Sequence, residues 1–590
     1  MPTRSLPNNP SLEHLRKDAK RLRSAVVAGE GAALGQVEEF YPRATRAIGR
    51  FSLADAQLVT ARSYGFASWT KLKQHLIAIG PFIWNPSSLP APQSRADVFV
   101  RLACLTYAGW HRSNPAKALR MLSDDPELAH ASIYTAAAVG DVAAVRKMLD
   151  SNPALVNAKG GSLRWAPLLY ACYSRLDAAD ANHSTLDVAR LLLSRGGDPD
   201  AGFLLEGSYA FTALTGAFGR GEDWSNQPPH PECGALARLL LDAGADPNDG
   251  QALYNRHFEK DNDHLKLLFA YGLGHDKHGP WMKRLNDPSF NPASLLVIEL
   301  CAAAQHNFVD RVQLLVDQGV DVNTPGLRNG RTPYEEAVRA GHQSIAAYLL
   351  DHGAKKIELD VLEAFALACI SARHEEARGR LTEDPSLLER LGHEGRLDML
   401  HRAVDAKQRE GVRLIVELGV DVNGVVPGTG LDRGVLHNAA GGCGLEMVKL
   451  LLELGADPTL RDPIYHSTPI GWAFHNQQHD VVDYLLTFAT IIDAVRCDGV
   501  ERVAALLQQD PSLSNAKDEE GNPLASYLHP EMARLEEMLG ILVAYGVPLN
   551  TRNKDGMTLL DRALARGWTD FANVLRRYGA RSGADLTAGA

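Results

Sequence analysis

Short apolar stripes with helical spacing, separated by glycine turns, recur along most of this chain. They are plainest over residues 315–354, LVDQGVDVNTPGLRNGRTPYEEAVRAGHQSIAAYLLDHGA. Thr332 and Pro333 predict a helix start, because threonine caps a first turn and proline suits the first helical position. Gly341 predicts a turn into a second helix and Gly353 predicts its end, since glycine tolerates left-handed backbone. One unit is therefore a helical hairpin followed by a projecting loop.

The same pattern recurs in several other segments. Four of them are RLLLSRGGDPDAG (190–202), RLLLDAGADPNDG (238–250), LIVELGVDVNG (414–424) and KLLLELGADPTLRD (449–462). These motifs resemble the ankyrin repeat family, which is marked by a TPLH-type helix start, a helical hairpin and a GADPN or GADVN finger. The resemblance covers about residues 95–580 and implies an all-α solenoid of about 14 helical-hairpin units. It also implies that His401 and His437, in the TPLH slot, hydrogen-bond neighbouring turns.

Three further segments lie outside the repeat array. Residues 1–80 predict a small N-terminal helical module, because their apolar positions form helical stripes. This module is similar to segments of bacterial ankyrin proteins. The Pro-rich residues 81–94 predict a semi-rigid linker, and residues 581–590 predict a disordered tail.

Composition and charge narrow the classes of function. The chain has 61 basic and 71 acidic residues, a formal net charge of −10, which disfavours nucleic acid as a partner. No stretch resembles a signal peptide or approaches a membrane span, so we expect neither export by the general route nor a membrane partner. The resemblance to bacterial ankyrin proteins implies a cytoplasmic protein. Seven cysteines, an odd number, predict no disulfide framework. Their spacing averages about two repeat lengths, so we interpret them as packing residues.

A local exception to the acidic balance is a basic stretch within residues 11–29. We interpret it as a solvated helix face, and docking of an acidic partner or nucleic acid is the alternative. The basic residues are Arg16, Lys17, Lys20, Arg21 and Arg23.

Stacked repeats leave an extended concave surface of first helices and fingers, which such proteins use for recognition. The favoured function is therefore a protein–protein interaction scaffold or inhibitor that uses this concave face. The sequence does not identify the protein partner. Trp472 and Phe474 fall on a first helix, and we expect them in the core.

Insertions in three successive units, over residues 174–184, 219–234 and 272–292, favour an alternative function. Long loops inside compact repeats are often functional, so these loops predict a small-molecule site or an active site between residues 174 and 292. The enzyme hypothesis is the less favoured one. The candidate proton carriers are His183, Asp223, His230 and His278, and the candidate ligand-binding or partner-binding residues are Tyr173, Arg175, Trp224, Tyr254, His257 and Trp281.

No sequence motif predicts a metal or a cofactor. The segments HPEC (230–233) and HDKH (275–278) have the residue types of metal sites but not the usual ligand spacing. The glycine-rich segment VVPGTGLDRG (425–434) does not match a phosphate-binding loop. We therefore expect neither a bound metal ion nor a cofactor.

Overall fold

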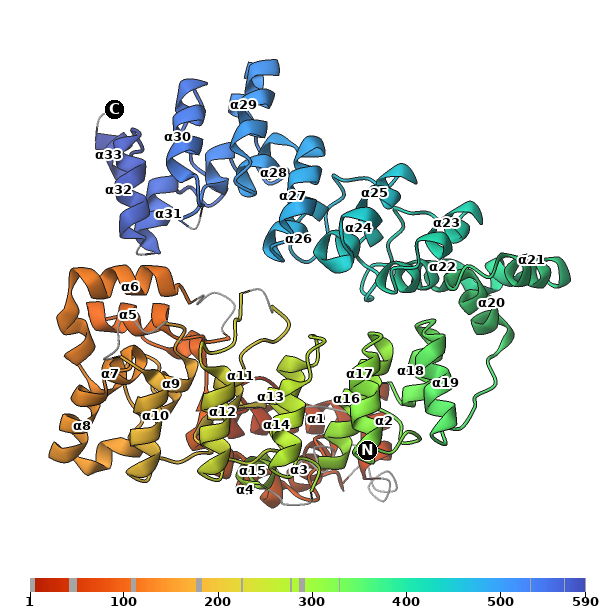
Figure 1. Cartoon of the computed structure of the whole chain (residues 1–590), viewed down its shortest axis with the longest axis horizontal. Coiled ribbons are helices and arrows are strands. Elements are labelled where there is room, and N and C mark those ends of the chain that lie inside the picture. Colours follow the sequence, from red (N-terminus) through yellow and green to blue (C-terminus); the bar gives the residue numbers. More distant parts are fainter. Residues whose placement is uncertain are drawn as a thin grey trace. The chain divides into compact units, whose positions relative to one another are not determined.

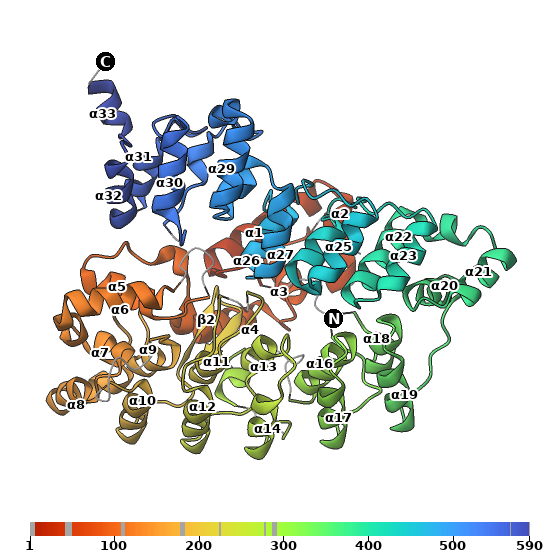
Figure 2. The same cartoon turned by 45° about the horizontal axis from the view of Figure 1, so that its top comes forward.

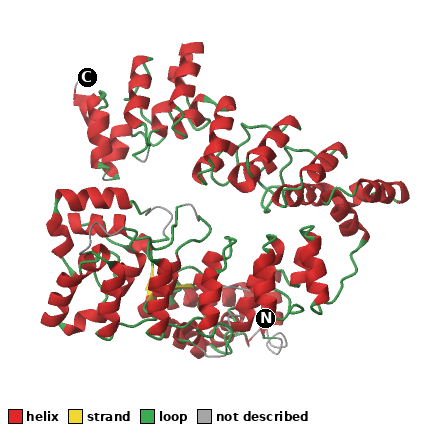
Figure 3. Ribbon diagram, in the orientation of Figure 1, coloured by secondary structure: helices red, strands yellow, loops and turns green. Residues whose placement is uncertain are grey.

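The computed structural model describes residues 6–41, 50–107, 113–176, 183–223, 226–275, 279–285, 292–327, 329–530, 532–566 and 568–588. The chain divides into two compact units. Unit 1 comprises residues 1–336 and 344–355, and unit 2 comprises residues 337–343 and 356–590. Both units consist mostly of helices (Figures 1 and 3). None of the described helices combines the length and the apolar character needed to cross a bilayer.

Unit 1 begins with four helices and continues into helical hairpins. Its elements are α1 (Leu12–Val27), α2 (Gly31–Phe40), α3 (Leu53–Ser63), α4 (Trp69–Ile79), η2 (Gly80–Phe82), β1 (Ile83–Trp84), η3 (Pro86–Ser88), α5 (Arg95–Ala103), α6 (Pro115–Asp124), η4 (Pro126–His130), α7 (Ile133–Val139), α8 (Val142–Ser151), η5 (Pro153–Asn157), α9 (Pro167–Tyr173), α10 (Thr185–Ser194), β2 (Gly202–Leu205), β3 (Tyr209–Thr212), α11 (Ala213–Phe218), α12 (Cys233–Asp242), α13 (Gly250–Arg256), α14 (Asp263–Ala270), α15 (Pro280–Leu285), α16 (Pro292–Gln305), α17 (Val309–Asp317), α18 (Pro333–Arg339) and α19 (Gln343–Asp351).

The boundary between the units falls within α18, and unit 2 continues from there to the last described helix. Its further elements are α20 (Val361–Ile370), α21 (His374–Glu383), α22 (Leu387–Asp405), α23 (Arg409–Glu417), α24 (Val435–Asn438), the π-helical turn η6 (Ala439–Cys443), α25 (Leu445–Glu453), α26 (Pro469–His475), α27 (His479–Leu485), η7 (Leu486–Phe488), α28 (Ile491–Arg496), α29 (Val500–Gln509), η8 (Pro511–Asn515), η9 (Leu524–Tyr527), α30 (Leu535–Ala544), α31 (Leu559–Ala565), α32 (Thr569–Arg577) and α33 (Gly583–Ala588).

The repeat over residues 315–354 forms the predicted hairpin. Thr332 caps α18, since its Oγ1 accepts a hydrogen bond from the backbone N–H of Glu335 at 3.2 Å. Gly341 has a φ of +75° in the turn, and Gly353 has a φ of +87° after α19. The three predicted punctuation points are therefore confirmed, because each residue type suits the backbone it must adopt.

A small sheet adds to the helical architecture. Strands β2 and β3 pair antiparallel, and β1 pairs parallel with β2, with Ile83 opposite Leu204 and Trp84 opposite Leu205. The hairpin loop consists of Glu206, Gly207 and Ser208, and Glu206 and Gly207 both have positive φ. The all-helical prediction did not include this sheet.

The segment predicted as a linker, residues 81–94, contributes β1 to this sheet and therefore packs against the repeats. Leu15 and Leu72 of the N-terminal helices share one apolar cluster with Leu204 and Trp281. In Figure 2 helix α4 accordingly lies beside β2. The first four helices are thus part of unit 1 and are not set apart from it.

The structure also differs at the C-terminal end. Within residues 581–590, for which a disordered tail was predicted, helix α33 forms. Asp585 accepts hydrogen bonds from the backbone N–H and the hydroxyl of Ser582, which caps the helix. Residues 589–590 lie outside the described part of the chain.

Candidate functional site

The insertion at residues 219–234 folds against its own repeats. Arg175 is 6% exposed and donates hydrogen bonds to the carbonyls of Pro228 at 2.7 Å, Gly216 at 2.8 Å and Ser174 at 2.9 Å. A fourth bond reaches the carbonyl of Cys172 at 3.2 Å. Because every nitrogen of this guanidinium already has a backbone partner, Arg175 holds the insertion in place.

His230 fixes the end of the same insertion. Its Nδ1 accepts a hydrogen bond from the Glu232 N–H at 3.0 Å, and its Nε2 lies 2.9 Å from the Thr185 hydroxyl. Burial, the larger cause, and the nearby Arg175 together lower the pKa of His230 to about 3. A pKa so far below neutral makes the imidazole a weak base, so it is poorly matched to general-base catalysis near pH 7.

Tyr173 and His257 are also interior residues. Tyr173 is fully buried, and its hydroxyl donates to the Thr212 carbonyl at 2.8 Å. His257 is 4% exposed and lies 3.8 Å from the Glu299 carboxylate, measured from Nδ1 to Oε1. Arg311, fully buried, pairs with the other Glu299 oxygen at 3.7 Å and donates to the carbonyls of residues 257, 259 and 261. This cluster therefore anchors the loop after α13.

The remaining sequence candidates are distributed over several elements. Tyr254, on α13, donates a hydrogen bond to the Glu222 carboxylate. The backbones of His183 and Asp141 form an isolated β-bridge. The Asp223 carboxylate accepts a hydrogen bond from the side-chain amide of Asn226 at 2.7 Å. Trp224 and His278 lie outside the described residues. Among the described residues, no group of three His, Cys, Asp or Glu side chains is arranged to hold a metal ion.

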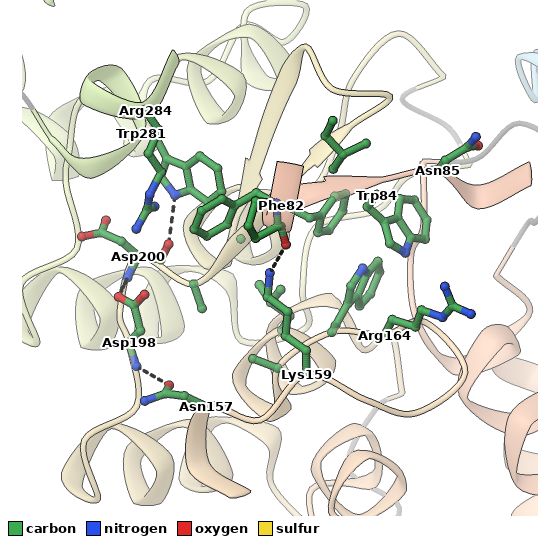
Figure 4. Close-up of a pocket in the computed structure, with 18 of the residues that line it drawn as sticks. Phe82, Trp84, Asn85, Asn157, Lys159, Arg164, Asp198, Asp200, Trp281 and Arg284 are labelled. Carbon is green, nitrogen blue, oxygen red and sulfur yellow. Dashed lines mark hydrogen bonds between the residues drawn. The ribbon is translucent and has the colours of Figure 1, made fainter. Parts of the chain in front are cut away.

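Trp281 lies in a pocket of about 670 Å³ in unit 1, which we call the Trp281 pocket (Figure 4). The pocket is formed by residues 81–89, the loop 157–166, the finger 198–203 and helix α15. Trp281 is 7% exposed, and its Nε1–H donates to the Asp200 carbonyl at 2.9 Å. Its ring also requires glycine at position 202, because a Cβ there would lie 2.7 Å from Cζ2 of Trp281.

Aromatic rings and cations alternate in the Trp281 pocket. The Arg284 guanidinium carbon lies 4.5 Å from the centre of the Phe82 ring and 4.7 Å from that of Trp281. The Lys159 ammonium lies 4.7 Å from the Phe82 ring and donates to the Pro81 carbonyl at 2.9 Å. In Figure 4, Asp198 and Asp200 lie at the same end as Trp281, and Arg164 lies at the end near Trp84. The pocket has room and contacts for a small ligand.

A second candidate site, the Trp472 surface, lies in unit 2. We define it by Arg433, Arg461, Ile464, Tyr465, Trp472 and Arg496, from three successive repeats. Ile464 is 60% exposed and Tyr465 is 65% exposed. Phe474, on the same helix as Trp472, is 38% exposed. The prediction that Trp472 and Phe474 belong to the core is therefore wrong for Phe474 and only partly right for the half-buried Trp472.

A buried carboxylate shapes this surface. Asp462, 2% exposed, accepts hydrogen bonds from the backbone N–H groups of Ile464, Tyr465 and Ser467 and from Nε1 of Trp472 at 3.0 Å. Burial alone raises the pKa of Asp462, but the hydrogen bonds outweigh it and leave the pKa below its ordinary value. The finger consequently holds two apolar side chains toward solvent.

Three arginines give the Trp472 surface a positive charge. The Arg433 guanidinium carbon lies 4.9 Å from the centre of the Trp472 ring, and that of Arg496 lies 6.0 Å from the Tyr527 ring. Arg461 pairs at 3.4 Å with Asp493, whose side chain is 3% exposed. Within the described part of the chain, neither Arg433 nor Arg496 forms an ion pair with a carboxylate.

Comparison with known proteins agrees with this description of the repeats. A family model described as "Ankyrin repeats (3 copies)" matches residues 298–360 and 400–495. These two ranges contain ankyrin repeats. The second matched range includes most of the Trp472 surface. In this ankyrin region His437 contacts the carbonyls of Gly434 at 3.3 Å and Ser467 at 3.1 Å, as the resemblance implies.

Two curated relatives share part of the sequence. The NF-kappa-B inhibitor cactus of Drosophila yakuba is 28% identical over 181 residues, which are 25% of this chain and 36% of the relative. The protein of the same name from Drosophila melanogaster is 27% identical over 180 residues, 25% of this chain and 35% of the relative. The chain thus spans about a third of the length of these relatives. The ankyrin repeats and this similarity suggest a role in protein interaction.

Sequence reasoning missed most residues of both candidate sites. Phe82 and Trp84 stand in the segment PFIW, and Phe203 and Phe211 stand in GFLLEGSYAFT. The turn residues between two apolar runs in the second segment are a hairpin signal that could have indicated the sheet. The exposure of Ile464 and Tyr465 had no such signal, because it depends on hydrogen bonds to Asp462.

Proposed function

We propose that this protein recognises an acidic, partly apolar segment of a protein partner through the Trp472 surface. The observation that carries this proposal is the combination of the exposed side chains of Ile464 and Tyr465 with arginines that, within the described residues, lack a carboxylate partner. Arg433, which lies over the half-buried Trp472, is the clearest example. Tryptophan, tyrosine and arginine are the side chains that most often dominate binding energy at protein interfaces.

Charge supports the acidic character of the partner. At the Trp472 surface the carboxylates of Asp462 and Asp493 are almost fully buried, whereas the three arginines are half-buried and so retain access to solvent. The chain as a whole carries −10. A locally positive area on an acidic protein favours acidic partners and speeds their encounter.

The remaining features of the proposal are expectations from the amino-acid sequence. We expect a cytoplasmic scaffold or inhibitor with about 14 repeats, in which first helices and fingers form the recognition face. The two relatives are named as an inhibitor, which agrees with this class but identifies no partner for this chain.

Selection from a random peptide display library tests the proposal. The intact chain should enrich peptides that combine aspartate or glutamate with aromatic or aliphatic residues. The double variant Ile464→Ser/Tyr465→Ser should bind them at least about tenfold more weakly, because it removes two exposed contacts.

A matched variant controls for unspecific effects. Val543 and Tyr545, 44% and 37% exposed, lie at the end of α30 in the same unit. The double variant Val543→Ser/Tyr545→Ser should retain the peptides. Peptides without acidic enrichment, or equal loss in both variants, would contradict the proposal.

A further inference from the structure

Two buried hydrogen-bond donors of the Trp281 pocket have no acceptor among the described residues. Nη1 of Arg284 and Nε1 of Trp165 are both buried and, within the described part of the chain, have no hydrogen-bond partner. Trp165 is 1% exposed. An unpaired buried donor costs free energy, so such groups indicate a missing acceptor.

Among the described residues, the cations of the pocket likewise lack a carboxylate in an ion pair. Partial burial lowers the pKa of Lys159, and the adjacent Arg284 lowers it further. Lys159 and Arg164 form no ion pair within the described residues, and the one hydrogen bond of Lys159 goes to a carbonyl. Two cations near one aromatic ring repel each other unless an anion lies between them.

The two carboxylates of the pocket accept hydrogen bonds from backbone N–H groups instead. Oδ1 of Asp198 accepts from the Asp200 N–H at 3.0 Å, and Oδ1 of Asp200 accepts from the Asp246 N–H at 2.9 Å. These bonds fix the fingers of neighbouring repeats. The pocket therefore has three cations and two carboxylates. Both carboxylates already accept hydrogen bonds from the backbone.

Flat aromatic surfaces form the rest of the wall. The rings of Trp165 and Phe203 are stacked, 4.9 Å apart and inclined by 8°, and Trp84 lies 4.8 Å from Phe203. Phe82 meets Trp281 edge to face at 5.3 Å. Such walls favour a planar ring, which can stack or meet an edge without disturbing them.

We propose that the Trp281 pocket binds a small planar aromatic molecule that carries a carboxylate or a phosphate. The anion would accept hydrogen bonds from Lys159 and Arg284, and Arg164 would add attraction from the other end. A volume of about 670 Å³ suits a ligand of this size. This site is separate from the Trp472 surface and does not depend on it.

Calorimetric titration of the full chain with three matched probes tests the inference. The probes are 2-naphthoate, 2-naphthyl phosphate and the uncharged 2-naphthamide. We expect one site for at least one of the two anions and at least about tenfold weaker binding of the amide, which lacks the charge. Whichever anion binds more tightly identifies the carboxylate or the phosphate as the natural group.

Charge-removing variants locate the site. Lys159→Gln/Arg164→Asn changes two exposed side chains and should weaken binding of the anion about tenfold without changing that of the amide. Arg190→Gln, a surface change elsewhere in unit 1, should have no effect on either. Unchanged thermal unfolding and unchanged selection of acidic peptides by the Trp472 surface would show that the variants are folded.

Three results would overturn the inference. They are equal affinity for the anions and the amide, an unchanged anion affinity in the double variant, and no binding of any probe at about 1 mM. Each leaves the proposed recognition of a protein segment intact, because peptide selection is measured separately.

Discussion

Unit 1 contains the three insertions noted in the sequence, whereas the exposed side chains of the Trp472 surface lie in unit 2. In unit 1 the described part of the insertion at residues 219–234 turns inward, where Arg175 and His230 attach it to the repeats. In unit 2 the finger between α25 and α26 presents Ile464 and Tyr465 to solvent. A long loop is therefore not by itself a binding loop, since its polar backbone can be satisfied within the fold.

The difference between the two units follows from two different uses of an arginine side chain. In unit 1 the guanidinium of Arg175 is buried and satisfies backbone carbonyls that regular repeats would pair in a tight turn. At the Trp472 surface Arg433 lies over an aromatic ring and remains accessible to a partner. Burial converts an arginine from a recognition group into a structural one.

The largest expected effect is the loss of Arg175. Arg175→Met should reduce the free energy of unfolding of unit 1 by at least about 3 kcal/mol, because four buried carbonyls lose a charged donor. Labelling of buried cysteines with iodoacetamide, resolved by mass spectrometry, measures each unit separately. Cys104 and Cys172 report on unit 1, and Cys369 and Cys497 report on unit 2.

Burial suppresses reaction of these thiols in the folded state, and it raises the pKa of Cys104 to about 12. Labelling of Cys104 and Cys172 should therefore accelerate in Arg175→Met, while Cys369 and Cys497 keep their rates. The control is Arg190→Ala, which breaks an exposed ion pair with Asp187 worth less than about 1 kcal/mol. Equal acceleration in both variants would contradict the structural role of Arg175.

The next largest effect is a pH dependence from His230. Its folded-state pKa of about 3 lies below the ordinary value of 6.5, so the folded state resists protonation. The stabilisation is present above pH 6.5 and is lost as the pH falls toward 3. Between pH 7 and pH 5 it should decrease by about 2 kcal/mol.

Urea unfolding of the wild type and of His230→Gln at pH 7, 6 and 5 measures this contribution. Since glutamine does not titrate in this range, the variant should lose less stability on acidification. Parallel decreases in the two proteins would show that His230 is not the group responsible.

A smaller pair of effects compares one tyrosine in each unit. Tyr173→Phe should cost about 1 kcal/mol, because it removes the bond from a buried hydroxyl to the Thr212 carbonyl. Tyr465→Phe should leave stability unchanged within error, since its side chain is largely exposed. Thermal unfolding measures both, and a larger loss for Tyr465→Phe would reverse the proposed contrast between the units.

The sequence predicted the repeat hairpins well, because their determinants are local. Thr332, Gly341 and Gly353 act through their own backbone conformation. It did not predict the pocket, which combines Phe82, Lys159 and Trp281 from segments far apart in the chain. Long-range proximity of this kind leaves no periodic pattern in a single sequence.

The insertions illustrate the same limit. Histidine and arginine are residue types suited to proton transfer and ligand binding, so His230 and Arg175 were candidates. Their burial and their contacts with the backbone decide what they do. Of the candidates named from sequence, Trp281 lies in the pocket proposed above to bind a ligand. The Trp472 surface lies outside the insertions altogether.

Photo-crosslinking in the native cell tests the central claim most directly. A benzophenone amino acid would replace Tyr465 of unit 2 or, as a comparison, Tyr209 of unit 1, which is 57% exposed. We predict a covalent adduct with a protein partner from position 465 only, and its loss when Arg433→Glu reverses the local charge. Adducts from position 209 but not from 465, or adducts unaffected by Arg433→Glu, would contradict recognition through the Trp472 surface.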